Sequence, residues 1–273
     1  MDADRATARR KSTTRRIAIA AALVLAIWTS LAYLALPFFW RRYERQRGLE
    51  GRAMVTRTAT GIPGDPINFG AVGAQRDVVC AFNAAGWSAA NATTLATALR
   101  IIDSVALRRP YPEAPVSPLY YNGRVEDLAF EKAEGGSADQ RHHIRLWRVL
   151  DKGDEGRPVW LGSATFDKGV GFSRYTLQVT HHIAADVDAE RDFVASQLAE
   201  VGMVEELYDV AGRGPTIDGR NGGGDRYFTD GEALVAVLSP DCREIPGKAQ
   251  PARHMPWQAR IKDAIWSALR RIL

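Results

Sequence analysis

The longest apolar segment of the chain is an uncharged run over residues 17–40, IAIAAALVLAIWTSLAYLALPFFW. An α-helix rises about 1.5 Å per residue, so this run would be roughly 36 Å long and would cross the ~30 Å hydrocarbon layer of a membrane with some tilt. A cleaved signal peptide has a shorter apolar region, of about 7 to 15 residues. The pattern therefore predicts a transmembrane helix over residues 17–40.

Beyond residue 60 the apolar spacing changes between helical and strand-like periods. Helical spacing predicts helices in AQRDVVCAFNAAGW, NATTLATALRIIDSVAL and DAERDFVASQLAEVG. In the last of these, the residues expected to face the core are Phe193, Val194, Leu198 and Val201. Strands are predicted in INFGAV, LAFEK, HHIRLWRVL, PVWLGSATF, YTLQVTHHI, VEELYDV and EALVAVLS. GIPGDP predicts a turn, and the prolines of RRPYPEAPVSPLYYNGR predict a long extended loop.

The order of these elements groups the strands in the middle of the chain and does not alternate them with helices. That order favours an α+β fold with a mixed or mostly antiparallel sheet and helices packed on it, preceded by one transmembrane helix. The predicted segments are a basic N-terminal tail (1–16), the transmembrane helix (17–40), a basic juxtamembrane linker (41–60), the α+β domain (61–244), and a linker with a basic amphipathic helix (245–273).

The last segment should contain a helix that begins near Pro256. One face of this helix would carry Trp257, Ile261, Ala264, Ile265, Ala268 and Ile272. A basic amphipathic helix in an anchored protein either lies on the membrane surface or packs its apolar face on its own domain. The second arrangement is commoner, and we expect it here.

Composition and charge agree with a globular domain behind a membrane anchor. Of 273 residues 46% are hydrophobic and 25% charged, and a net charge of +4 does not by itself imply nucleic acid as a partner. More cations precede the apolar run than follow it, which favours the N-terminus in the cytoplasm and the domain across the membrane. Cys80 and Cys242 either form one disulfide, if exported, or remain two buried thiols; neither has a metal-type spacing, and buried thiols are the simpler expectation.

Candidate chemistry is concentrated in two histidine doublets, in RHHIRLWR and THHIAADVDAERD. Because side chains alternate across a strand, each doublet offers one histidine to a given site. If the two strands are neighbours, one histidine from each with one following aspartate would form a two-histidine, one-carboxylate site for zinc or iron. The candidate metal ligands are His142, His143, His181, His182, Asp186 and Asp188.

The competing interpretation of THHIAADVDAERD is an ordinary helix start. Asp186 or Asp188 would cap the helix, Glu190 would complement its dipole, and Arg191 would pair with one of these carboxylates. The chain contains neither HExxH nor paired CxxC motifs, so the helix start is the simpler interpretation.

A second candidate site is the glycine-rich stretch DGRNGGGDRYFTDG. Consecutive glycines allow positive φ angles and close backbone approach, which suits an anion. The residues of this predicted anion site are Arg220, Asn221, Gly222, Gly223, Gly224 and Asp225. The stretch fits neither a P-loop nor a dinucleotide fingerprint, and the competing interpretation is a flexible surface loop.

Several long blocks also carry a resemblance to a known family. They are GDPINFGAVG, RPYPEAPVSPLYYNGRVEDLAFEK, RHHIRLWR, PVWLGSATFDKGVGFS, THHIAADVDAERDF and GRNGGGDRYFTDGEALVAVL, within about residues 61–240. In these blocks the chain resembles the LssY C-terminal domain family of bacterial membrane-associated proteins. The resemblance implies a domain without an established activity, found behind a membrane helix or beside DedA-like and phosphatidic-acid-phosphatase-like segments. It supplies no catalytic residues.

From these observations we expect a single-pass protein of the bacterial inner membrane whose domain, on the periplasmic side, is a binding or accessory module of the cell envelope. Its partners would be the lipid bilayer and envelope proteins. The alternative is a metal-assisted hydrolase acting on a phosphate or ester at the membrane surface. There the doublets and an aspartate would hold a divalent metal, Glu190 would be the general base, and Arg145, Arg191 or the loop 221–225 would receive the anion.

Overall fold

The computed structural model describes residues 2–35, 38, 46, 48–49, 52–90, 118–134, 140–177, 179–211, 218–245, 251, 253–255 and 257–269. The helix predicted in NATTLATALRIIDSVAL lies outside these residues. The chain divides into two compact units, Met1–Glu44 and Arg45–Leu273.

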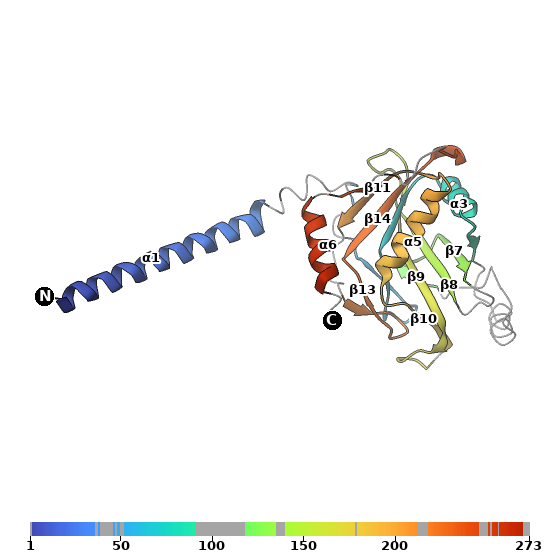
Figure 1. Ribbon diagram of the computed structural model, residues 1–273. Coiled ribbons are helices and arrows are strands. Elements are labelled where there is room, and N and C mark those ends of the chain that lie inside the picture. The colour runs from blue at the N-terminus through green and yellow to red at the C-terminus, as the bar shows by residue number, and fades with distance from the viewer. Residues whose placement is uncertain are drawn as a thin grey trace. The chain divides into compact units, whose positions relative to one another are not determined.

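The first unit is helical. Helix α1 (Asp2–Ser30) continues into a π-helical turn, η1 (Leu31–Ala35) (Figure 1). Its segment Thr14–Ala35 has a mean hydropathy of 2.2 and is long and apolar enough to cross a membrane. The predicted apolar helix is therefore confirmed.

The second unit contains a large mixed sheet. Its strand order is β15-β11-β14-β3-β9-β8-β7-β4, and β10 also pairs with β9. The strands are β3 (Phe69–Val72), β4 (Ser88–Ala89), β7 (Leu128–Ala133), β8 (Arg141–Leu150), β9 (Val159–Phe172), β10 (Val179–Ile183), β11 (Val204–Ala211), β14 (Glu232–Leu238) and β15 (Arg253–His254). Only β14 with β3 and β11 with β15 pair in parallel among these described strands. The α+β class with a mostly antiparallel sheet is confirmed.

Helices α3 (Gln75–Ala84) and α5 (Val187–Glu200) cover one face of this sheet (Figure 1). Side chains alternate along each strand, so the core has one part on each face of the sheet. Leu234 and Ala236 of β14 pack toward the helices, whereas Val235 and Val237 pack on the opposite face. The inward residues predicted for α5 lie against the helix-side core as expected.

A small sheet takes part in the core on the opposite face. Its order is β2-β1-β5-β6, with β1 (Val55–Arg57), β2 (Pro63–Pro66), β5 (Tyr120–Tyr121) and β6 (Arg124–Val125). The turn predicted in GIPGDP is present only at its first residue, where Gly61 has a positive φ angle and donates to the Thr58 carbonyl. The remainder is wrong, because Pro63–Pro66 forms the edge strand β2. The extended loop was also wrong at its described end, where Asn122 and Gly123 adopt positive φ angles and close the β5–β6 hairpin.

Two further expectations are corrected near the C-terminus. Cys80 of α3 and Cys242 of η2 (Pro240–Cys242) form a disulfide with a Cα–Cα distance of 5.9 Å, so the cysteines are not two buried thiols. Helix α6 (Trp257–Leu269) forms as predicted. Its apolar face is not packed on the domain, because Trp257, Ile261 and Ile265 are all about half exposed.

Candidate functional site

The two histidine doublets lie on either side of β9. Asp167 of β9 pairs with Arg141 of β8 on one edge and with Ile183 of β10 on the other. The predicted metal site required the two doublet strands to be direct neighbours. They are not, because β9 lies between them. Each doublet does divide between two faces, and His143 and His181 both point toward Asp167.

Asp167 is the centre of a buried charge cluster. Its Oδ2 atom lies 3.2 Å from His143 Nδ1 and 3.8 Å from His181 Nδ1, and it accepts a hydrogen bond from Arg141 Nε at 3.1 Å. The guanidinium of Arg145 donates to His143 Nε2 at 3.2 Å. We call Arg141, His143, Arg145, Asp167 and His181 the Asp167 cluster. The side chain of His181 is 18% exposed, and the other members are buried.

The Asp167 cluster forms part of the wall of a cavity of about 240 Å³. The remaining wall includes Asp65 of β2, the connection before it, Ser173 and Thr176 between β9 and β10, and the loop 221–223. Two guanidinium groups, those of Arg141 and Arg145, are thus balanced by the carboxyl groups of Asp65 and Asp167. The wall offers donors and acceptors without a large net charge.

The burial of this cluster changes its ionisation. Burial alone would raise the pKa of Asp167, but the neighbouring His143, His181 and Arg141 outweigh it and hold that pKa below its usual range. Burial, aided by nearby cations, lowers the pKa of His181 to about 4 despite the attraction of Asp167. At neutral pH the cavity therefore presents an ionised aspartate beside a neutral imidazole.

The cluster contains buried polar atoms without hydrogen-bond partners among the described residues. They include Asp167 Oδ1 and His181 Nε2. Most buried polar groups in proteins have partners, and an exception at a cavity indicates a place where a ligand or water completes the contacts. His143 also lines the cavity, and its Nε2 atom already contacts Arg145 and Thr165 Oγ1.

The described residues contain no group of three or more histidine, cysteine or acidic side chains arranged to hold a metal ion. The Asp167 cluster comes nearest in composition, since two imidazoles and one carboxylate suit zinc or iron. However, Arg141 already donates to the carboxylate oxygen that both imidazoles approach. That guanidinium supplies positive charge where an ion would lie. The predicted metal site stays a prediction.

The remaining doublet histidines lie apart from the cavity. His142 Nδ1 contacts Glu190 Oε2 of α5 at 2.9 Å, and its ring stacks on Phe193 with centroids 4.1 Å apart. His182 Nδ1 lies 2.8 Å from Asp225 Oδ1. Glu190, the predicted general base, is thus buried against the histidine that the cavity does not use.

The predicted helix start is present at α5. Asp186 is its N-cap and accepts a hydrogen bond from the Ala189 amide at 3.1 Å. Asp188 accepts from the Thr229 hydroxyl and from the Asp230 amide, both at 2.7 Å. These contacts assign both aspartates to the local structure of α5.

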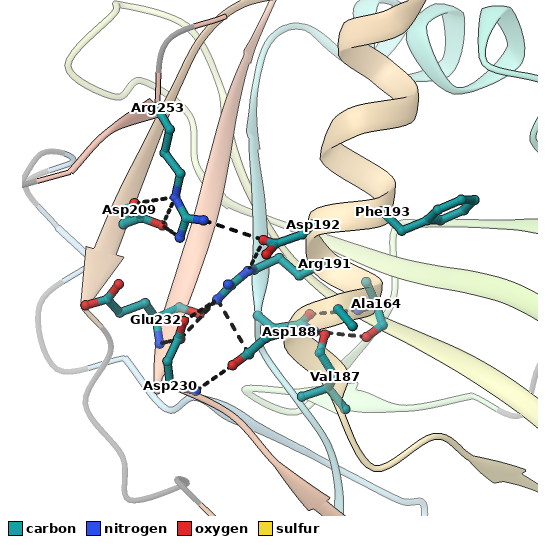
Figure 2. A network of polar contacts seen from close by, with 12 residues as sticks. Ala164, Val187, Asp188, Arg191, Asp192, Phe193, Asp209, Asp230, Glu232 and Arg253 are labelled. Atoms are coloured by element: carbon teal, nitrogen blue, oxygen red, sulfur yellow. Dashed lines mark hydrogen bonds and ion pairs between the residues drawn. The ribbon is translucent and has the colours of Figure 1, made fainter. Parts of the chain in front are cut away.

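Arg191, itself buried, belongs to a second charge group (Figure 2). Its Nη1 atom contacts both Asp230 oxygens, at 3.0 and 3.1 Å, and the Glu232 carbonyl at 3.2 Å. We call Asp188, Arg191, Asp192, Asp209, Asp230 and Arg253 the Arg191 network. Burial raises the pKa of Asp188 to about 6, although Arg191 opposes that rise. None of these six residues lines the cavity described above.

The glycine-rich stretch forms a tight hairpin between β12 (Asp218–Arg220) and β13 (Arg226–Phe228). Asn221 Oδ1 accepts from the amides of Gly223 and Asp225, at 3.1 and 2.9 Å, and Arg220 donates to the Gly224 carbonyl. The hairpin thus uses several of its own donors. Of the predicted anion site, Asn221, Gly222 and Gly223 line the cavity.

Sequence reasoning missed Arg141 and Asp167, although a signal was present. Polar residues recur at every second position over parts of two strands. They are Arg141, His143 and Arg145 on β8, and Ser163, Thr165 and Asp167 on β9. Because the period of a strand is two, this pattern predicts one polar face shared by adjacent strands.

A family model described as the LssY C-terminus matches residues 43–233, a range that contains the entire Asp167 cluster. No curated protein and no solved structure matches the chain.

Proposed function

This chain belongs to the LssY C-terminus family, and we propose that it is a membrane-anchored module of the cell envelope that binds a small polar ligand at the Asp167 cluster. The observation that carries the proposal is that Asp167 Oδ1 and His181 Nε2, buried atoms of two residues that line one cavity, have no partner among the described residues. A bound molecule that contacts both atoms would offset the cost of burying them.

The wall of the cavity limits the chemistry of this ligand. A volume of about 240 Å³ corresponds to roughly eight waters at ~30 Å³ each, which suits a small molecule or one headgroup. Cationic donors come from Arg145 and Arg141, an amide from Asn221, and acceptors from Asp167 and neutral His181. The ligand would therefore carry both an acidic group and hydrogen-bond donors.

The proposed location is the periplasmic side of a bacterial inner membrane, with the lipid bilayer and envelope proteins as partners. The apolar segment Thr14–Ala35 supports the anchor. The Cys80–Cys242 disulfide supports an oxidising compartment, since disulfides are rare in reducing cytosol. The cationic flanks of the apolar run support a cytoplasmic N-terminus.

Hydrolysis of a phosphate or ester in the same cavity is the second candidate. The observation that favours it is the neutral imidazole of His181, whose Nδ1 faces Asp167 while its Nε2 has no partner in the part of the chain that the structure describes. An imidazole held this way by a carboxylate is suited to accept a proton from an attacking water.

Thermal unfolding of the full chain in detergent tests both candidates. The unfolding midpoint is measured with inorganic phosphate, with glycerol 3-phosphate and with zinc, and metal content is measured directly. We expect at least one of these probes to raise the midpoint by several degrees, because a ligand that binds only the folded state stabilises it. The rise should disappear in the variant His143→Ala/His181→Ala.

The matched control is His142→Ala/His182→Ala, which removes the two histidines that do not face Asp167. It should keep the ligand response. A response that survives the first double variant, or that neither protein shows, contradicts binding at the Asp167 cluster. Stoichiometric metal lost only from the first variant would favour the hydrolase.

A further inference from the structure

Helix α6 presents an apolar face to solvent. Trp257, Ile261 and Ile265 are 53%, 51% and 57% exposed and recur every four residues, so they lie along one side of the helix. The alanines on the same side, Ala264 and Ala268, are exposed as well. A monomeric soluble domain rarely leaves such a stripe uncovered, and its presence indicates a binding surface.

The start of α6 is held close to the point where the chain enters the second unit. Strand β15, which ends three residues before α6, pairs with β11 so that His254 lies opposite Tyr208. Arg253 fixes this strand through Asp209, with Nε–Oδ2 at 2.8 Å (Figure 2). The hydroxyl of the same Tyr208 accepts a hydrogen bond from Gln46 Nε2.

Chain length limits how far that entry point can lie from the bilayer. Gln46 is buried and its backbone amide donates to Asp154 at 2.7 Å, and it follows Ala35, the last residue of the apolar segment Thr14–Ala35, by only eleven residues. Even fully extended, such a connection spans at most roughly 40 Å. The connection therefore leaves the beginning of α6 within reach of the membrane surface.

The charge of the segment also suits a lipid surface. Within and just after α6 the sequence contains Arg260, Lys262, Arg270 and Arg271 against the single acid Asp263. Cations flanking an apolar stripe are typical of helices that lie in the interface of membranes with anionic lipids.

We infer that α6 lies flat on the membrane surface, with Trp257, Ile261 and Ile265 in the interface between headgroups and acyl chains. The second unit would then be attached twice, by α1 and by α6, and its orientation toward the bilayer would be fixed. This inference needs the membrane anchor but not the cavity ligand, so the two proposals can fail separately.

The test places an environment-sensitive fluorophore on Ile261→Cys in the full chain, reconstituted in vesicles of phosphatidylcholine and phosphatidylglycerol. Since both native cysteines are in the disulfide, the new thiol alone is labelled. We expect blue-shifted emission and several-fold quenching by a spin-labelled lipid, because the label should lie in the interface.

The control is the same label on Leu177→Cys, an apolar position that is 77% exposed. Leu177 follows the end of β9, whereas the turn that binds Gln46 precedes its beginning, and the strand between them is roughly 45 Å long. The emission of this label should therefore remain that of a label in water. Adding Ile265→Asp to the Ile261→Cys protein should reverse the shift, whereas Val125→Asp, at an exposed apolar position elsewhere, should not.

Two results would overturn the inference. One is a label on residue 261 that stays accessible to a soluble quencher, which would mean that α6 does not enter the interface. The other is equal quenching on residues 261 and 177, which would mean non-specific adsorption of apolar sites. Circular dichroism of each variant verifies that the fold is retained.

Discussion

The Arg191 network and the Asp167 cluster both combine arginines with aspartates, and they differ in whether their polar atoms have partners. Both oxygens of Asp188 accept hydrogen bonds, and Arg191 contacts four acceptor groups. In the Asp167 cluster, Asp167 Oδ1 and His181 Nε2 have no partner among the described residues. A saturated network stabilises its own fold, whereas an unsaturated one at a cavity is arranged for a molecule from outside.

The comparison gives different mutational expectations for the two groups. In the network, removing one charge leaves other buried charges without compensation. In the cluster, removing an atom that has no partner leaves no new unsatisfied group. Stability should therefore depend on the Arg191 network, and ligand response should depend on the Asp167 cluster.

The largest expected effect is that of Arg191→Met, which should lower the free energy of unfolding by about 4 kcal/mol, because Asp188 and Asp230 lose their buried cation. Urea denaturation of the full chain in detergent measures it. The control Arg226→Met removes an exposed pair with Asp218 and should change nothing measurable. A loss in Arg191→Met no larger than in the control would show that the network is not structural.

The next effect is a pH dependence that originates in the cluster. The pKa of His181 is about 4 in the folded protein and 6.5 as its ordinary value, so the unfolded chain binds more protons between these pH values. Stability should therefore fall by about 3 kcal/mol as pH drops from 6.5 to 4, and this loss should end below pH 4.

His181→Gln isolates this contribution. Asp188, whose pKa is raised to about 6, acts in the opposite direction over part of the range, so the useful quantity is the difference between wild type and variant. That difference should grow in favour of the variant as pH falls, while His254→Gln, at an exposed histidine, should follow the wild type. Parallel pH profiles for wild type and His181→Gln would disprove the buried neutral imidazole.

The smallest expected effect is a difference in stability at pH 7 between variants on the two faces of the doublets. His142→Ala should cost about 2 kcal/mol, because it leaves the buried Glu190 carboxylate without that partner and removes a ring stacked on Phe193. His181→Ala should cost less than about 1 kcal/mol. Chemical denaturation of both variants decides the order, and a larger cost for His181→Ala would contradict the division proposed here.

Local features of the sequence predicted much of the fold. The α5 helix, its Asp186 cap and its inward residues follow from spacing and capping preferences within a few residues. The separation of each histidine doublet onto two faces follows from the two-residue period of a strand. The strand ends were less predictable: β9 continues to Phe172, beyond the predicted PVWLGSATF.

The composition of the cavity was not predictable from local patterns, because it depends on which strands become neighbours. Asp167 meets His143 and His181 only because β9 lies between β8 and β10, with a register shift between His182 and Ile183. The disulfide joins positions separated by 162 residues, which no local pattern indicates. The exposure of α6 was missed because amphipathicity predicts an apolar face without predicting what covers it.

The Cys80–Cys242 bond also shortens the covalent path between the two ends of the molecule. Helices α1 and α6 lie outside the loop that this bond closes, whereas β4 through β14 lie inside it. A peptidase cut anywhere inside the loop would leave both fragments on one molecule under non-reducing conditions. A domain nicked in this way would still carry both helices, and it would separate into two pieces only when reductant is added.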